Sequence, residues 1–116
     1  MLEETCIIRG FWAPSNIEMC QKFLDGHRNV LKEHGFTHFK SNEQSWFVNK
    51  KVFVLVALIN NEVVGGIRLE QRTGVGTLSL EKAIMPIDNS ISSYLDTLGN
   101  NCLIETCGLW NSKSIA

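Results

Sequence analysis

The sequence has no surplus of one charge and no long apolar run, and both absences narrow the class of protein. Eleven Lys and Arg residues oppose twelve Asp and Glu residues, for a net charge of -1, so no strong field attracts nucleic acid or an anionic membrane. The longest apolar run, at residues 52–59, is far shorter than the ~20 residues of a membrane-spanning helix. The acidic start, MLEE, has no basic segment followed by an apolar stretch, which argues against a signal peptide. We therefore expect a soluble, cytoplasmic protein.

The chain also has little proline and no cysteine pattern that would bind a metal. Two prolines occur, and no linker rich in Pro, Gly or Ser and no internal repeat divides the 116 residues. Cysteines are scattered at Cys6, Cys20, Cys102 and Cys107, without the C-x2-C pairs that zinc prefers and without a secreted context for disulfides. We expect one domain over residues 1–116, with structural thiols and no metal site.

An alternation of strand and helix patterns predicts an α/β domain. Residues 5–11 are rich in β-branched side chains and are expected to form a first strand. From Ile17 onward apolar residues recur at helical spacing, which predicts one face of an amphipathic helix. Ser15 or Asn16 can cap the start of this helix, and Gly35 suits a left-handed stop at its end.

The clearest pattern is a β-hairpin. Residues 52–59 and 62–71 are two β-rich runs, and the Asn-Asn pair between them supplies the turn. The second run contains Gly65 and Gly66. This pair predicts a bulge, or a place where another group approaches the backbone closely.

The last third of the chain holds shorter elements. We expect a loop at residues 73–76, a short extended piece at 77–80, a two-turn helix at 91–98 and a strand at 102–110. A final strand this apolar needs a covering element, because an open edge favours aggregation. We therefore expect that the chain is the front part of a longer domain, or that a partner chain completes it.

Two segments follow the order of elements found in a known enzyme family: residues 54–69 (VLVALINNEVVGGIRL) and residues 105–111 (ETCGLWN). They resemble the second, third and fourth strands of the GCN5-related N-acetyltransferase superfamily, which has the acyl-CoA N-acyltransferase fold. The resemblance implies an α/β domain with a mixed, largely antiparallel sheet and a packed amphipathic helix. It also implies transfer of an acyl group from acetyl-CoA or another acyl-CoA to an amine.

In that superfamily the backbone at the end of the fourth strand holds the pantetheine arm of coenzyme A. The matching residues here are Leu109, Trp110 and Asn111. The family's pyrophosphate motif, R/Q-x-x-G-x-G/A, would begin near Ala116, where this sequence has Ala in place of Arg or Gln. The resemblance thus implies an incomplete N-acyltransferase-like domain that lacks the coenzyme A pyrophosphate loop.

The chain is also similar to the branch of acyl-homoserine-lactone (autoinducer) synthases and long-chain N-acyl amino acid synthases. Those enzymes carry an Arg in the third strand and a Glu in the fourth, positions that Arg68 and Glu105 match. Glu105 is the candidate general base, because burial in an apolar strand favours proton uptake by a carboxylate. The alternatives are a solvent-facing carboxylate or one paired with Arg68. Arg68 is the candidate substrate-binding residue, since a guanidinium can hold a carboxylate through two hydrogen bonds; the alternative is a cross-strand charge partner.

Other residues carry weaker signals. His34 and His38 have the spacing of a metal-binding pair, but Gly35 interrupts the helix between them. Cys107 has no basic neighbour in the sequence and is expected to be a core thiol, not a nucleophile. The three tryptophans are expected in the core. Trp110 also falls where the pantetheine or acyl chain would run in the resembled fold.

A second hypothesis belongs to a different class of function. The chain would then be a non-catalytic binding or dimerisation module, completed by a partner strand or forming a homodimer through its exposed final strand. Neither hypothesis involves nucleic acid, a membrane or a metal.

Overall fold

Strands and helices alternate along the chain in the order that the sequence predicts, with one added helix. The computed structural model describes residues 5–39, 43–99 and 103–112. Its elements are β1 (Cys6–Trp12), α1 (Ile17–Glu33), β2 (Val52–Ile59), β3 (Glu62–Gln71), α2 (Ser79–Ile84), α3 (Ile91–Asp96) and β4 (Ile104–Asn111), with short 3-10 helices η1 (Ala13–Ser15) and η2 (Ser45–Val48).

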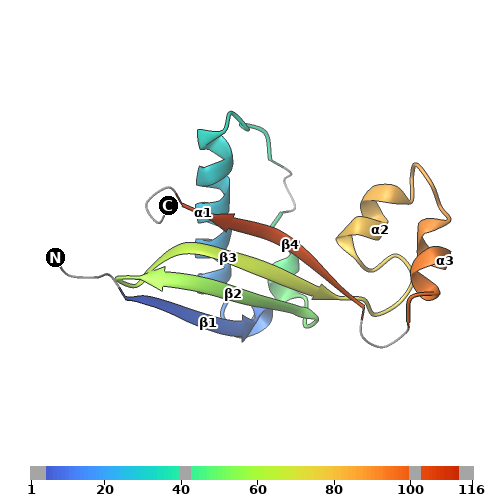
Figure 1. Ribbon diagram of the computed structural model, residues 1–116, viewed down its shortest axis with the longest axis horizontal. Helices are drawn as coiled ribbons and strands as arrows, with labels where there is room; N and C mark the ends of the chain where they lie inside the picture. The colour runs from blue at the N-terminus through green and yellow to red at the C-terminus, as the bar shows by residue number, and fades with distance from the viewer. Residues whose placement is uncertain (1–4, 40–42, 100–102, 113–116) are drawn as a thin grey trace.

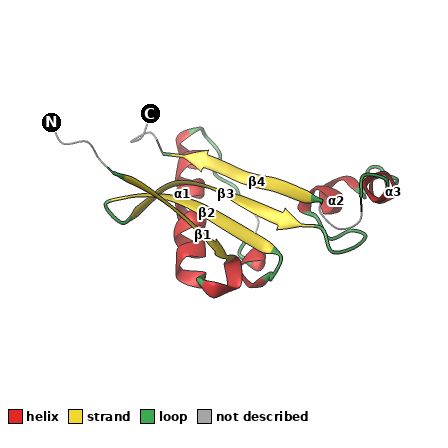
Figure 2. Ribbon diagram, turned by 60° about the horizontal axis from the view of Figure 1, so that its bottom comes forward, coloured by secondary structure: helices red, strands yellow, loops and turns green. Residues whose placement is uncertain are grey.

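The described strands form one antiparallel sheet in the order β1-β2-β3-β4 (Figure 1). Helix α1 crosses one face of this sheet, and α2 and α3 form a small lobe beyond the end of β3 and the start of β4 (Figure 1, Figure 2). The expected α/β class, with a largely antiparallel sheet and a packed helix, is confirmed. Within the described sheet β1 and β4 are the edge strands, so the final strand has an open edge as predicted.

The β2–β3 hairpin turns at Asn60 and Asn61, which both have left-handed backbone conformations (φ 51° and 65°). A two-residue turn with positive φ at both positions matches the right-handed twist of the flanking strands. Asn tolerates that conformation better than most residues do. The predicted hairpin is therefore confirmed, together with its turn.

Helix α1 begins and ends through the local signals found in the sequence. The Asn16 side chain accepts a hydrogen bond from the Met19 amide at 3.0 Å, which satisfies one free amide of the first turn. At the other end Gly35 has φ 90°, and the Phe36 amide donates to the Leu31 carbonyl at 3.0 Å. This is a Schellman stop, and it ends the helix at Glu33.

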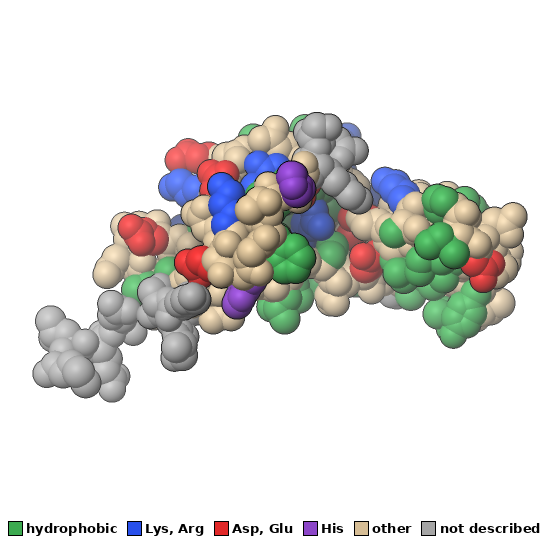
Figure 3. All heavy atoms as spheres, turned by 90° about the horizontal axis from the view of Figure 1, so that it is seen from above, with side chains coloured by type: hydrophobic (Ala, Val, Ile, Leu, Met, Phe, Trp, Pro, Cys, Tyr) green, Lys and Arg blue, Asp and Glu red, His purple; other side chains and the backbone are tan. Residues whose placement is uncertain are grey.

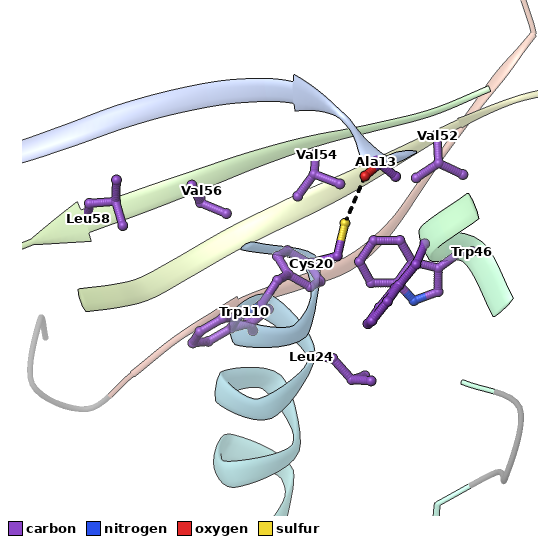
Figure 4. Packing of buried hydrophobic residues seen from close by; sticks show 11 residues of the cluster. Ala13, Cys20, Leu24, Trp46, Val52, Val54, Val56, Leu58 and Trp110 are labelled. Carbon is purple, nitrogen blue, oxygen red and sulfur yellow. Dashed lines mark hydrogen bonds between the residues drawn. The ribbon is translucent and has the colours of Figure 1, made fainter. Parts of the chain in front are cut away.

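The hydrophobic core lies between α1 and the sheet (Figure 4). Alternate side chains of β2 are buried, as expected for a strand with one face against a core. The helices contribute aromatic side chains to the same core, from Phe23 on α1 and Trp46 on η2. Cys20 is fully buried and its thiol contacts the Ala13 carbonyl oxygen at 3.3 Å. Burial raises the pKa of this thiol to about 11, so Cys20 is structural, as predicted.

Gly65 and Gly66 occupy the irregular part of the sheet that the sequence indicated. The β2–β3 register shifts beside Gly65 and the β3–β4 register shifts beside Gly66. A Cβ on Gly66 would lie 2.6 Å from the Leu55 carbonyl oxygen and 2.8 Å from the Phe23 ring. Both parts of the prediction, a bulge and a close approach, are confirmed.

Two expectations are wrong. Residues 77–80 were expected to be extended, but α2 begins there at Ser79. The cause is Glu81, whose carboxylate accepts hydrogen bonds from the Gly76 amide at 2.7 Å and the Leu78 amide at 3.3 Å and so winds the chain into a turn. Trp12 was expected in the core, but it is 50% exposed on the face of the sheet opposite α1 and packs edge-on against Phe53. The start of the predicted strand at residue 102 lies outside the described residues.

Helix α1 can approach β4 closely because Gly26 has no side chain. A Cβ at this position would lie 2.2 Å from the Trp110 indole. Gly to Ala normally stabilises a helix interior by about 1 kcal/mol, but here the added methyl must displace a buried ring. We expect Gly26→Ala to destabilise the protein by about 2 kcal/mol, because overpacking outweighs helix propensity.

Urea unfolding followed by circular dichroism measures this effect. The matched control is Asn29→Ala, an exposed position on the same helix, which should be neutral or slightly stabilising. A Gly26→Ala variant as stable as Asn29→Ala would contradict the packing of α1 on Trp110.

Candidate functional site

An open cavity of about 610 Å³ lies between α1, η2, the β3–β4 strands and α2. Its walls carry aromatic and charged side chains, with His27 on α1, Trp46 on η2, Arg68 on β3 and Lys82 on α2. Figure 3 looks into the hollow between α1 and the α2–α3 lobe, where a basic side chain is visible at depth. Arg28, Arg68 and Lys82 line it together with the carboxylates of Glu43 and Glu70. Cations therefore outnumber carboxylates beside aromatic rings, a combination that can hold an anionic small molecule.

Arg68 is a cation of this cavity that packs on an aromatic ring and has a buried nitrogen without a hydrogen-bond partner. Its guanidinium carbon lies 4.8 Å from the centre of the Trp46 ring, and its Nε is buried without a hydrogen-bond partner. The four ion pairs found among the described residues involve Lys22, Arg28 and Arg72, and none of them includes Arg68. The ring face compensates part of the cost of burying this cation. A carboxylate or other anion would compensate the rest.

Among the described residues Glu105 forms no ion pair with Arg68, so this alternative to a catalytic Glu105 is not found. The β3–β4 register places Glu105 opposite Glu70 and Arg68 opposite Cys107. Two like charges in direct opposition are unfavourable. Both carboxylates instead accept hydrogen bonds from the start of α2: Glu70 from the Ser79 amide at 3.0 Å and Glu105 from the Leu80 amide at 2.8 Å.

These contacts assign a structural task to both glutamates. They attach the first turn of α2 to the strands, where negative charge is favourable beside free helix amides. Glu70 is 4% exposed and lines the cavity. Glu105 is half-buried and is not among the side chains that form the cavity wall.

The end of β4 has a backbone irregularity next to the cavity. The strand register passes from Gly66 opposite Trp110 to Arg68 opposite Cys107, so two β4 residues face one residue of β3. One of these two, Gly108, has φ 68°, a conformation that favours glycine. Gly108 lines the cavity. This β-bulge turns the β4 backbone at the cavity wall.

The structure separates the three residues that the resemblance assigns to coenzyme A. The Leu109 side chain is 76% exposed, whereas the Trp110 side chain is 6% exposed and belongs to the core. Asn111 is exposed at the strand end. The Trp110 side chain would have to leave the core to contact a bound pantetheine or acyl chain. The backbone of these residues lies on an edge strand, so a contact to the backbone stays a prediction.

His27 is a cavity residue that the sequence analysis missed. Its ring lies parallel to Trp110, with centroids 6.4 Å apart and an interplanar angle of 9°. Burial lowers the pKa of His27, the positive charge of Arg68 lowers it further, and Glu43 opposes them. Burial and the charge of Arg68 therefore both favour the neutral imidazole. The available signal was its spacing, four residues after Phe23 and hence on the apolar face of the helix.

The other candidate residues from the sequence, Cys107, His34 and His38, have surroundings that do not favour catalysis or metal binding. Burial raises the pKa of the Cys107 thiol, and the adjacent Arg68 opposes this effect, so the thiol stays protonated and is a poor nucleophile. His34 and His38 are exposed. Within residues 5–39, 43–99 and 103–112, no group of three His, Cys, Asp or Glu side chains could hold a metal ion.

Comparison with known proteins adds no relative: no family model, no curated protein and no solved structure matches this chain. In the part of the chain that the structure describes, no helix has the length and apolar character needed to cross a membrane.

Proposed function

We propose that this chain contributes the acceptor side of an N-acyltransferase, in which an acyl group passes from an acyl-CoA to the amine of a small molecule that carries a carboxylate. The observation that supports this proposal is the guanidinium of Arg68, held over Trp46 in the cavity without an anionic partner. A planar guanidinium binds a carboxylate through two parallel hydrogen bonds. Binding of the carboxylate would orient the amine of the same molecule within the cavity.

The donor side of the proposal rests on β4. This strand pairs with β3 alone in the described sheet, so one row of its backbone amides and carbonyls has no strand partner. An extended ligand with amide groups, such as pantetheine, can add to a strand edge through such groups. The bulge at Gly108 lies where this edge meets the cavity. Acetyl-CoA or a longer acyl-CoA is the corresponding donor substrate, and a cytoplasmic location would supply it.

The test is release of free thiol from acetyl-CoA or octanoyl-CoA in the presence of the standard amino acids. Amino acids combine an amine with a carboxylate, and their methyl esters are the matched acceptors without the charge. We expect thiol release with the acids and much less with the esters. Equal rates with both acceptors would remove the role of Arg68, and no release with either would overturn the proposed reaction.

The role of Glu105 as base stays a prediction, and its contact with α2 gives a separate one. Glu105→Ala removes the acceptor for the Leu80 amide, a charge-assisted hydrogen bond, and should lower the free energy of unfolding by about 1.5 kcal/mol. Glu105→Gln keeps an oxygen acceptor and should lose less. Thermal and urea unfolding of both variants measure the difference.

Glu105→Gln also tests the chemistry, because it retains the acceptor oxygen but cannot take up a proton. A fall in turnover with unchanged coenzyme A binding would assign Glu105 the role of base. Equal unfolding free energies for Glu105→Ala and the unmodified chain would show that the contact with α2 contributes nothing.

A second candidate function, a dimerisation module, is favoured by the open side of the sheet. Ile8 is 63% exposed and Ile104 is 53% exposed, and β4 presents a free edge. Either pairing of β4 with the β4 of a second copy or contact between two open faces would cover this surface. Sedimentation velocity measures whether the chain is a dimer. A dimer that binds neither acyl-CoA nor amino acids in separate titrations would favour the dimerisation module.

A further inference from the structure

The cavity wall carries the His27 imidazole beside the β4 bulge. A Cβ built on Gly108 would lie 3.9 Å from Cε1 of His27, so the ring lies against the backbone at the point where β4 changes register. Trp110 lies parallel to the ring, and Phe23 meets it edge-on with centroids 6.4 Å apart. Packing on two sides fixes the orientation of the imidazole, which an exposed side chain would not have.

The charged groups around His27 are arranged on several elements. Arg68 on β3, Arg28 on α1 and Lys82 on α2 are cationic, Glu43 before η2 and Glu70 on β3 are anionic, and all five line the same cavity. Glu43 accepts a hydrogen bond from Arg28 at 2.9 Å, so these two charges largely cancel. Burial lowers the pKa of the imidazole, and the positive charge of Arg68 lowers it further, so both favour the unprotonated ring. An unprotonated ring nitrogen is a proton acceptor.

We propose that His27 is the group that accepts the proton of the attacking amine in the acyl transfer, an inference that rests on the proposed function. The acceptor's carboxylate binds Arg68, and its unprotonated amine attacks the thioester carbonyl. As the C–N bond forms, the nitrogen becomes positively charged and its proton passes to His27. The C–S bond breaks, the thiolate leaves with the electron pair, and His27 returns the proton to it. The products are an amide and a free thiol, and the imidazole is regenerated.

Position favours His27 over Glu105 in this role. His27 forms part of the cavity wall that also carries Arg68. The Glu105 carboxylate accepts a hydrogen bond from the Leu80 amide and is absent from that wall. A general base must reach the proton that it removes, so geometry decides before acidity does.

The experiment compares His27→Asn with His38→Asn, a matched change at an exposed histidine outside the cavity. Thiol release from acetyl-CoA or octanoyl-CoA with the standard amino acids is measured against pH. We expect His27→Asn to lower kcat about 100-fold while KM for the acyl-CoA stays unchanged. The unmodified protein and His38→Asn should lose kcat in acid with a midpoint below the ordinary histidine pKa of 6.5, and the kcat profile of His27→Asn should lack this acid limb.

A second readout does not depend on turnover. The Cε1 proton of His27, assigned in the NMR spectrum by its loss in His27→Asn, should titrate with a midpoint below 6.5 and shift on addition of octanoyl-CoA. Unchanged kcat and the same acid limb in folded His27→Asn would overturn the assignment of His27 and leave the proposed reaction intact. No thiol release from the unmodified protein would overturn both.

Discussion

Replacing Arg68 by methionine should lower kcat/KM for a carboxylate-bearing acceptor about 100-fold, with the acyl-CoA donor still bound. Methionine preserves apolar contact with Trp46 but removes both hydrogen bonds to the carboxylate. Each hydrogen bond to a charged group contributes about 1.5–3 kcal/mol, so the loss of two bonds weakens binding of the acceptor by at least about 2.7 kcal/mol. A loss of about 2.7 kcal/mol corresponds to a 100-fold lower kcat/KM. Steady-state thiol release at varied acceptor concentration measures it.

Two further variants test whether the loss of kcat/KM in Arg68→Met comes from the lost hydrogen bonds to the acceptor carboxylate. Arg9→Met makes the same chemical change at an exposed position on β1, and its kcat/KM should equal that of the unmodified protein. Arg68→Lys retains the charge without the planar fork, so an intermediate value is expected. If Arg68→Met and Arg9→Met behave alike, Arg68 does not bind the acceptor.

Replacing Glu81 by glutamine should lower the free energy of unfolding by about 3 kcal/mol, the largest stability effect that we expect. Glu81 is fully buried in the α2–α3 lobe. Its carboxylate accepts hydrogen bonds from Arg72 Nε at 2.8 Å and Ser92 Oγ at 2.7 Å. Glutamine leaves the Arg72 guanidinium with one counter-charge, the exposed Asp96 carboxylate at 2.6 Å. Losing the buried partner of a buried cation is costly. The surface variant Glu18→Gln, in an exposed pair with Lys22, should change stability little.

The same carboxylate predicts the direction of the acid response. Hydrogen bonding from Arg72 is the main cause that lowers the pKa of Glu81 from 4.5 to about 2. A lowered pKa in the folded state means that the group stabilises the fold above pH 4.5, and that this stability is lost as pH falls from 4.5 toward about 2. Urea unfolding at several pH values should therefore show the unmodified protein and Glu81→Gln converging in acid. A constant difference across this range would contradict the ion pair as its source.

The elements that the sequence predicted are those whose signals lie within a few residues of each other. Asn60 and Asn61 supply both left-handed positions of the hairpin turn, and Asn16 and Gly35 supply the two ends of α1. Each of these contacts closes a loop of a few residues. Their formation needs no information from distant parts of the chain.

The elements that were missed depend on contacts across the sequence. The start of α2 is held to the strands by Glu70 and Glu105, which accept hydrogen bonds from the Ser79 and Leu80 amides. Glu81, three residues after Leu78, was a local signal for this turn that the expected extended piece did not use. His27 gave no sign of function because its neighbour Trp110 is 83 positions away in the chain, the difference between the two numbers. Spacing on one helix face shows that a histidine is buried but not what surrounds it.

The sequence by itself determined the hairpin, the amphipathic helix and the antiparallel α/β class, because periodicity and turn chemistry are local properties of the chain. It also marked Arg68 and Glu105 as polar residues in apolar strands. Only the tertiary structure decided that Glu105 attaches α2 while Arg68 stays unpaired in a cavity beside His27. The physical reason is that the partners of a buried charge are set by strand register and helix packing, which bring together residues that no local pattern connects.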